Sequence, residues 1–374
     1  MIVGGGIGGL AAAISLRRAG VDAVVFERAE ELREIGAGIT LWANAIKALG
    51  RLGMAEAVRE AGTPWMGGAL RSPDGGIIYE IPAAAMEERF ESDGVVLHRA
   101  ELQRTLLGAL DGDAVRLGAG FTGFEQGQTG VVARFADGRE ERCDLLVGAD
   151  GLHSTVRAQL LDDGPPCYAG YTAWRGVVAW LGGETGFESW GRGERFGLVD
   201  IGRGRSYWYA GKNAPEREKG SVGRKEELLE RFGSWHEPIP EIIGAMEETG
   251  ILRHDVYDRG PTKRWGEGRI TLLGDAAHPM TPDLGQGACQ AIEDAVVLAR
   301  CVREEGDDDV VAALRLYEGR RKRRTTAIGR RSRLLGRVAQ FENPLLCRLR
   351  DSLVKATPLR AQLRQLAPII GYEA

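Results

Sequence analysis

Three glycines near the N-terminus, Gly4, Gly6 and Gly9, stand in the GxGxxG spacing of a dinucleotide-binding turn. Gly4 permits a tight turn, Gly6 lets a pyrophosphate approach the backbone, and Gly9 lets the following helix pack closely on its strand. The helix N-terminus favours negative charge because its N–H groups are free. Glu27, about 20 residues further on, can accept hydrogen bonds from an adenosine ribose. The pattern over residues 1–28 therefore predicts dinucleotide binding, without deciding between FAD and NAD.

Two later segments each place polar residues at the end of a strand-like apolar run. The first is DLLVGADGLHSTVR, residues 144–157, in which Asp150 follows a buried-strand pattern. The second is GDAAHPMTPDLGQG, residues 274–287, which lies between the apolar run RITLL and a helix-like 3.6-residue period. Asp150 or Asp275 alone could be an ordinary loop aspartate at a strand end. Their joint occurrence with the glycine fingerprint disfavours this ordinary alternative.

The three motifs in this order resemble the single-component, group A FAD-dependent aromatic hydroxylases, which are monooxygenases with the p-hydroxybenzoate hydroxylase fold. The likeness covers nearly the whole chain. It implies bound FAD, with NAD(P)H as a transient reductant, because the sequence holds only one dinucleotide fingerprint. It also implies that O2 adds to the reduced flavin as a C4a-hydroperoxide, which hydroxylates a small aromatic or heteroaromatic substrate.

The resemblance also implies which residues contact FAD. Arg28 follows the ribose-binding Glu27, whereas Arg99 and Gln103 match positions that reach the phosphates and the ribityl chain. Backbone N–H groups at 285–287 would face the pyrimidine edge of the flavin, and the helix after them would stabilise negative charge there. The expected cofactor-binding residues are Gly4, Gly6, Gly9, Glu27, Arg28, Arg99, Gln103, Asp150, Arg157, Asp275, Pro282, Gly285, Gln286 and Gly287. The segment GAGITLWANA, residues 36–45, resembles the family's loop near the flavin, with Ala43 where a proline is usual.

A narrower likeness, to FAD-dependent urate hydroxylases and the zeaxanthin-epoxidase-like branch, implies substrate residues. An Arg, a Tyr and an Asp line the substrate site of the urate enzymes, and Arg195, Tyr207 and Asp283 fall at matching places. We expect these three to be catalytic, although each has an ordinary alternative as a surface, sheet-core or helix-capping residue. Arg195 would suit a urate-like anion or an aromatic acid. The tryptophans could equally form an apolar slot for a quinone-type or lipid-like ring, so the substrate stays open.

The elements that must position these residues predict an α/β fold. We expect a Rossmann-like FAD-binding domain with a parallel sheet, formed by residues 1–70, 95–166 and 266–330. Residues 71–94 and 167–265 are expected to form an interleaved substrate domain with an antiparallel sheet. Six tryptophans lie there and, beside a cofactor domain, favour a pocket wall over plain core: Trp174, Trp180, Trp190, Trp208, Trp235 and Trp265. Residues 331–374 are expected to be C-terminal helices, broken at Pro344 and Pro358 and packed on the body.

Composition excludes several other classes. The net charge of -4 gives no footprint for nucleic acid, and the basic run at 320–324 favours a solvated helix face. Five widely spaced cysteines and five histidines predict neither disulfides nor a metal site. We expect a reduced cytoplasmic protein without stable membrane insertion, because no apolar run reaches the roughly 20 residues of a membrane span and no signal peptide is evident. Met1–Val3 predict an unusually short first strand or a start further upstream. The sequence does not indicate the oligomeric state.

Other activities are possible on the same scaffold. An FAD-dependent epoxidase or dehydrogenase acting on a lipid-like ring stays open, because it needs the same FAD motifs. A flavin halogenase is disfavoured because the WxWxIP pattern is missing from the sequence. A non-catalytic binder resembling the GDP-dissociation inhibitors would not need Asp275 with the 285–287 turn, nor the segment 144–157.

Overall fold

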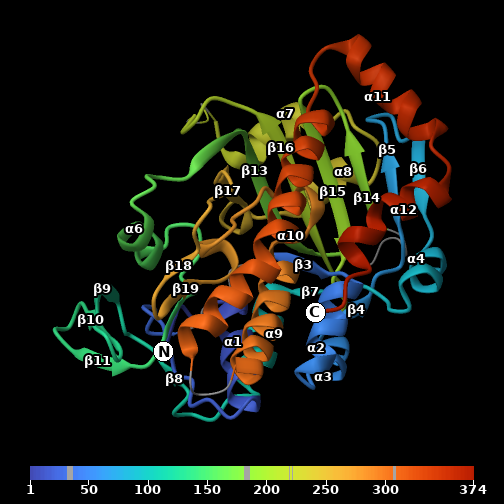
Figure 1. Ribbon diagram of the computed structural model, residues 1–374. Helices are drawn as coiled ribbons and strands as arrows, with labels where there is room; N and C mark the ends of the chain where they lie inside the picture. Colours follow the sequence, from blue (N-terminus) through green and yellow to red (C-terminus); the bar gives the residue numbers. More distant parts are fainter. Residues whose placement is uncertain (32–36, 181–185, 219, 221, 306–308) are drawn as a thin grey trace.

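Two large sheets, joined by a layer of long helices, make up the computed structural model (Figure 1). It describes residues 1–31, 37–180, 186–218, 220, 222–305 and 309–374. Gly36, the first residue of the segment 36–45, lies outside these ranges. The α/β class is as predicted: a parallel sheet, an antiparallel sheet and C-terminal helices are all present.

The first sheet has six strands, and β1 lies near its centre although it is only two residues long. All neighbouring pairs are parallel except the edge pair β18–β19. Its strands in spatial order are β18 (Gly266–Glu267), β19 (Ile270–Leu272), β12 (Leu146–Gly148), β1 (Ile2–Val3), β2 (Val25–Phe26) and β8 (Val115–Arg116). Because parallel strands end at the same edge, the residues after β1, β12 and β19 lie close together.

Helices pack against this sheet and against one another. Helix α1 (Ile7–Arg18) lies on α9 (Gly287–Glu305), which also packs on α2 (Ala43–Arg51) and on α10 (Val310–Ala339). Gly8 and Ala291 allow the close approach of α1 and α9, since a Cβ at Gly8 would lie 3.2 Å from the Ala291 methyl carbon. Two further helices follow strands at this layer, namely α5 (Arg99–Leu107) and α6 (Thr155–Leu161).

The second large sheet has seven strands, and all its neighbouring pairs are antiparallel except β14–β5. In spatial order they are β17 (Leu252–Asp258), β13 (Cys167–Ala179), β16 (Arg205–Asn213), β15 (Glu194–Asp200), β14 (Gly186–Trp190), β5 (Gly68–Arg71) and β6 (Ile77–Ile81). The boundary expected after residue 70 falls inside β5. The division into domains therefore stays a prediction.

One face of the seven-stranded sheet is plain apolar core. It packs on α7 (Arg224–Phe232) and α8 (Ile239–Ala245), and Trp174 and Trp208 are fully buried there. The expectation that the tryptophans form a pocket wall is wrong for these two, because strand alternation turns their positions away from the cofactor side. Trp180 and Trp235 pack against the same core, whereas Trp265 contacts His278 outside the sheet. Of the six, Trp190 lines a cavity.

Two small antiparallel sheets complete the strands. The first consists of β3 (Gly38–Leu41), β7 (Val95–His98) and β4 (Thr63–Pro64), and it leads into α5. The second is a hairpin meander of β9 (Phe121–Gln126), β10 (Val131–Phe135) and β11 (Glu140–Cys143). The turn between β10 and β11 places Gly138 at a φ of 85°, which favours glycine.

The C-terminal region is helical, as predicted. After α10, α11 (Pro344–Ala356) packs against β6, and α12 (Leu359–Ile370) packs against α4 (Ala83–Phe90) and α2. Pro344 occupies the first turn of α11 and Pro358 precedes α12, so both prolines stand where a helix begins. Among the described residues, no helix is both long and apolar enough to cross a membrane.

Candidate functional site

The glycine-rich turn between β1 and α1 has room for a diphosphate. Gly4 has a φ of 109°, and a Cβ there would lie 2.4 Å from the Ala149 carbonyl oxygen. A Cβ at Gly9 would lie 1.9 Å from the Gly4 carbonyl oxygen, so only glycine permits this packing. Gly6 begins α1 without a side-chain cap, and its Cβ would meet nothing within 4 Å. The open space therefore faces the free N–H groups of a helix N-terminus, which fits a cofactor phosphate.

Glu27 and Gln103 hold this turn in place. The Glu27 carboxylate accepts hydrogen bonds from the N–H groups of Gly5 (2.6 Å) and Ala29 (2.9 Å). Gln103 on α5 donates to the Gly5 carbonyl oxygen at 2.9 Å. A carboxylate has about four acceptor sites, so Glu27 retains capacity for ribose hydroxyls. Arg28 beside it is exposed.

Asp150 helps to cap α6, together with the N-cap residue Ser154. Its carboxylate accepts a hydrogen bond from the Ser154 hydroxyl and from the N–H groups of Thr155 (2.7 Å) and Val156 (3.2 Å). Burial raises the pKa of Asp150, and these hydrogen bonds oppose the rise. A Cβ at Gly4 would lie 2.9 Å from the Asp150 Cα, so the Asp150 loop closes one side of the glycine turn.

Arg157 of α6 points into the protein. Its guanidinium is fully buried and donates to the carbonyl oxygens of Ala276 and Ala277, both at 2.9 Å. The remaining donors pair with Asp163. Since Arg157 donates to these two carbonyl oxygens, it positions the turn that carries Asp275, and its contact with FAD stays a prediction.

Asp275 lies where the first sheet ends and α9 begins. It stands in a 3-10 turn at Gly274–Ala276, is exposed, and its Oδ1 would be 3.8 Å from a Cβ at Gly287, the first residue of α9. Arg99, exposed at the start of α5, is close enough for its charge to act on this carboxylate. The arrangement offers a carboxylate for hydroxyl groups beside a helix N-terminus that favours negative charge.

The turn before α9 exposes backbone at Gly285. A short helix at Pro282–Leu284 ends at Gly285, which has a φ of 60° and is exposed. A Cβ there would lie 3.1 Å from the Trp42 indole nitrogen. Gln286, in contrast, is buried as a whole residue, so the exposed backbone of this turn is that of Gly285.

A buried polar network lies beneath this turn. Asn44 donates to Gln286 Oε1 at 3.0 Å and to Glu293 Oε1 at 2.6 Å, and Gln290 donates to the same two oxygens. Arg321 on α10 pairs with Glu293 at 2.6 Å. Side chains from α2, α9 and α10 therefore fix the position of Gln286.

The same network fixes the other end of the segment 274–287. Asp294 binds Arg321 and the His278 Nε2, both at 2.6 Å, and accepts from the Gly274 N–H at 3.0 Å. The expectation that the run 320–324 is a solvated face is wrong for Arg321, which is completely buried. Periodicity could not show this, because the buried carboxylates that compensate Arg321 lie on another helix.

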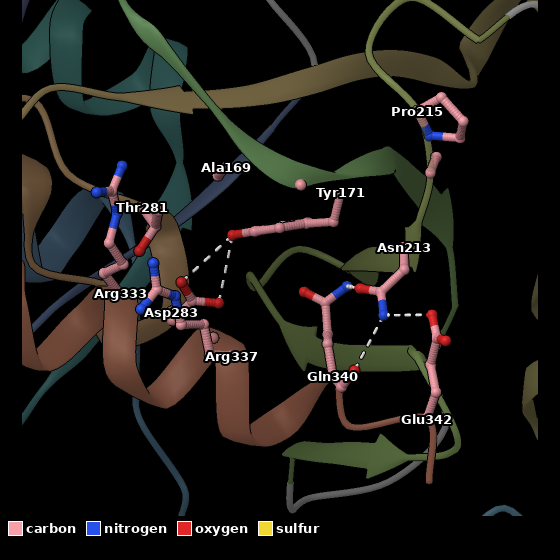
Figure 2. Close-up of a pocket in the computed structure, with 13 residues that line it drawn as sticks. Ala169, Tyr171, Asn213, Pro215, Thr281, Asp283, Arg333, Arg337, Gln340 and Glu342 are labelled. Atoms are coloured by element: carbon pink, nitrogen blue, oxygen red, sulfur yellow. Dashed lines mark hydrogen bonds between the residues drawn. The ribbon is translucent and has the colours of Figure 1, made fainter.

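Two of the three expected substrate residues come together. Arg195 on β15 pairs with Asp283 at 2.6 Å, with side chains 6% and 0% exposed. Burial would lower the pKa of Arg195, but Asp283 raises it further, so the guanidinium stays charged. Tyr171, which we did not predict, places its hydroxyl 3.3 Å from both Asp283 oxygens (Figure 2). Its ring lies 5.1 Å from the Arg195 guanidinium carbon.

Tyr207, the third expected substrate residue, lies against β3. Its ring faces β3, where a Cβ at Gly38 would lie 2.5 Å from the tyrosine. It also lies 6.0 Å from the ring of Tyr209, which covers Gly197 on β15. Burial raises the pKa of both phenols, so they remain protonated hydrogen-bond donors at neutral pH.

Two cavities border Asp283 and Leu284. The smaller, about 490 Å³, is lined by Tyr171, Asp283, Arg333 and Arg337 among others (Figure 2). The larger, about 900 Å³, lies between the seven-stranded sheet and the helices α10–α12. Its lining is mainly apolar and includes Trp42, Trp65, Trp190, Leu284, Leu335 and Val338. A cavity of this size and chemistry is typical of a small-molecule site.

These features fit a dinucleotide cofactor site with an adjoining apolar cavity, and comparison with known proteins identifies the class. Residues 1–332 match the family model described as FAD binding domain. The aurachin C monooxygenase/isomerase of Stigmatella aurantiaca is 45% identical over 95% of this chain and 93% of its own. The FAD-dependent urate hydroxylase of Klebsiella pneumoniae is 36% identical, covering 86% and 85%.

Two further comparisons agree. The 2-heptyl-3-hydroxy-4(1H)-quinolone synthase of Pseudomonas aeruginosa is 34% identical over 97% of this chain and 95% of its own. The crystal structure of Klebsiella pneumoniae HpxO with FAD and uric acid has a TM-score of 0.92 at 32% identity, covering 99% and 96%. The chain belongs to the FAD-binding class A monooxygenases with the p-hydroxybenzoate hydroxylase fold. It is an FAD-dependent monooxygenase that hydroxylates aromatic or heteroaromatic substrates.

Proposed function

We propose that the substrate is an uncharged heteroaromatic ring with an apolar chain. The observation behind this proposal is the cavity of about 900 Å³. Its wall includes Trp42 and Leu284, which adjoin the exposed turn at Gly285. A ring bound there would reach the flavin, and the chain would extend between the sheet and α10–α12. Each buried methylene of the chain would contribute about 0.8 kcal/mol.

The charges around Arg195 support an uncharged ring. Asp283 neutralises the guanidinium at 2.6 Å, and Glu188 lies 3.5 Å from its other nitrogen. A urate-like anion would therefore meet two carboxylates beside one guanidinium, and burying a charge without a partner is unfavourable. The names of two relatives agree, since one concerns aurachin C and the other a quinolone that carries a heptyl chain.

FAD, when bound, supplies electron transfer from NAD(P)H to O2 and transfer of one oxygen atom to the substrate. We assign the following roles to residues of the protein. The turn 285–287 and the N-terminus of α9 hold the flavin ring and favour negative charge there. The apolar cavity wall excludes water and orients the ring. Burial and then Glu188 raise the pKa of Tyr209 well above the usual range, so its phenol stays protonated and donates a hydrogen bond. Arg195 and Asp283 hold the sheet against the turn.

The length of the substrate's alkyl chain tests the proposal. The holoenzyme should be assayed for NAD(P)H consumption and for ¹⁸O incorporation from O2 with 2-methyl- and 2-heptyl-4-quinolone, urate and 3-amino-4-hydroxybenzoate. We expect the heptyl compound to have a KM at least about tenfold below that of the methyl compound. Coupled hydroxylation of urate, with no turnover of either quinolone, would overturn the proposal.

A variant of the cavity wall tests whether the alkyl chain of the substrate lies in the large cavity. Val338→Trp places a large ring in the cavity wall and should raise the KM for the heptyl compound while sparing the methyl compound. Val311→Trp is the matched control, because Val311 is an exposed residue at the start of the same helix. Equal kinetics of the two variants with the heptyl compound would place its chain elsewhere.

A further inference from the structure

One face of α11 is apolar although it is open to solvent. Leu345, Leu346, Leu349 and Leu353 are 69%, 44%, 55% and 60% exposed. At about 100° per residue, the four side chains fall within an arc of about 100° of the helix surface. We call these four residues the leucine face. Of the eleven large hydrophobic residues exposed in the described chain, these four and Leu334 lie within 20 residues of one another.

The rest of α11 has two other faces. Cys347 and Arg350 are buried, and the Arg350 guanidinium lies 5.0 Å from the Trp190 ring and donates to the Ala339 carbonyl oxygen. These contacts fix the helix on the body. Arg348 and Lys355 are exposed and flank one edge of the leucine face, as helical spacing requires. Apolar, basic and docked faces in one helix are typical of an interfacial helix.

The charge of the surrounding segment favours an anionic partner. Residues 331–374 contain eight Lys and Arg but only three Asp and Glu, whereas the whole chain has a net charge of -4. The leucine face therefore lies in a segment whose own net charge is positive. Lipid bilayers that contain anionic headgroups attract such segments electrostatically.

The position of α11 also fits a flat partner. Helix α11 lies at the outer edge of the molecule beside β5 and β6 (Figure 1). Val354 and Thr357, at its C-terminal end, line the large apolar cavity, and Leu334 of α10 lines it too and is 61% exposed. A surface that covers the leucine face would therefore lie next to the cavity.

We propose that the leucine face binds the surface of an anionic lipid bilayer. Helix α11 would lie in the plane of the headgroups, its leucines in the acyl boundary and Arg348 and Lys355 beside lipid phosphates. A second copy of the chain fits less well. A stable interface needs about 800 Å² per partner, more than one 13-residue helix offers, and pairing would bring like charges together.

The test is flotation of the FAD-loaded protein with phosphatidylcholine vesicles and with vesicles of about equal parts phosphatidylcholine and phosphatidylglycerol. We expect binding to the anionic vesicles to exceed binding to the neutral ones by about tenfold and to fall with salt. Leu345→Gln with Leu349→Gln and Leu353→Gln should lower binding by about tenfold or more. Leu117→Gln, an exposed leucine outside α11, should leave it unchanged.

Flavin absorbance shows that each variant is folded, and light scattering gives its oligomeric state. Equal vesicle binding by wild type and triple variant would overturn the proposal, and so would failure of the wild type to bind. A wild-type dimer that the triple variant converts to a monomer would assign the face to a second copy instead. The readout is binding alone, so the result does not depend on which substrate is turned over.

Discussion

Among single residues, the glycines of the first turn show how one residue type serves different needs. Gly4 and Gly9 are required by the protein itself, because a Cβ at either would overlap backbone atoms. Gly6 is not required by the protein, since its Cβ would meet nothing within 4 Å. Conformational demand therefore does not explain Gly6, whereas close approach of a cofactor phosphate does.

We expect Gly6→Ala to fold normally but to lower FAD content, because its methyl group would stand in the space for the diphosphate. Gly112→Ala is the control, since its Cβ also meets nothing within 4 Å. Flavin absorbance per protein and the thermal midpoint of the apoprotein measure the two effects. Full flavin content in Gly6→Ala would remove the diphosphate from this position.

The pair of Arg195 and Asp283 is expected to behave as a unit. Asp283→Ala leaves a buried guanidinium with only Glu188 at 3.5 Å, and removing one partner of a buried pair costs about 3–5 kcal/mol. Arg195→Met combined with Asp283→Leu should recover most of that loss. Urea unfolding of the two single variants and the double variant gives the coupling free energy. Additive losses would show that the two side chains do not depend on each other.

At the scale of elements, α10 supports the active-site turn through its small residues. A Cβ at Gly336 would lie 2.5 Å from Asp283 Oδ2, whereas a Cβ at Gly319 on the same helix would meet nothing. Gly319→Ala should therefore stabilise the protein by up to about 1 kcal/mol through helix propensity. Gly336→Ala should destabilise it and displace Asp283. Thermal midpoints of the two variants decide this, and a gain in both would mean that the turn adjusts freely.

The network between α9 and α10 predicts a pH dependence. Burial raises the pKa of Asp294, but His278 and Arg321 lower it more, and Arg324 and Arg321 likewise lower the pKa of Glu293. Carboxyl groups with lowered pKa stabilise the fold above their unfolded pKa of about 4, and that stability is lost as pH falls through the folded value.

Urea midpoints between about pH 3 and pH 6 measure this loss. The wild type should lose more stability over that interval than a variant in which Asp294→Asn, Glu293→Gln and Arg321→Met are combined. Parallel curves would show that other carboxyl groups dominate acid unfolding.

The sequence predicted the elements better than the contacts between them. The glycine turn, the strand ending before Asp150, the helix at 287 and the breaks at Pro344 and Pro358 follow from local chemistry. The inward turn of Arg157 and Arg321 does not, because their partners lie on other elements. Tyr171 was missed because strand alternation alone does not show which face of the sheet meets the cofactor.

For the whole molecule, FAD is expected to stabilise the fold by binding segments that lie far apart in the sequence. The proposed contacts come from residues 4–28, 99–157 and 275–287. Because FAD binds the folded chain, removing it should lower the thermal midpoint, and FAD at about 100 times its Kd should add about 2.7 kcal/mol. Thermal unfolding across an FAD titration measures this, with riboflavin as a ligand that lacks the diphosphate. An unchanged thermal midpoint would mean that FAD does not bind the folded protein in preference to the unfolded protein.

The strand β15 limits where the sequence of this protein can gain or lose residues. Arg195 faces Asp283, whereas the next residue, Phe196, faces the core with Trp208 and Phe232. Since strand residues alternate, deleting one residue within β15 would exchange the two faces. A guanidinium would then enter the apolar core and a phenyl ring would meet a buried carboxylate. Insertions and deletions in this sheet are therefore confined to its turns, such as the one at 201–204.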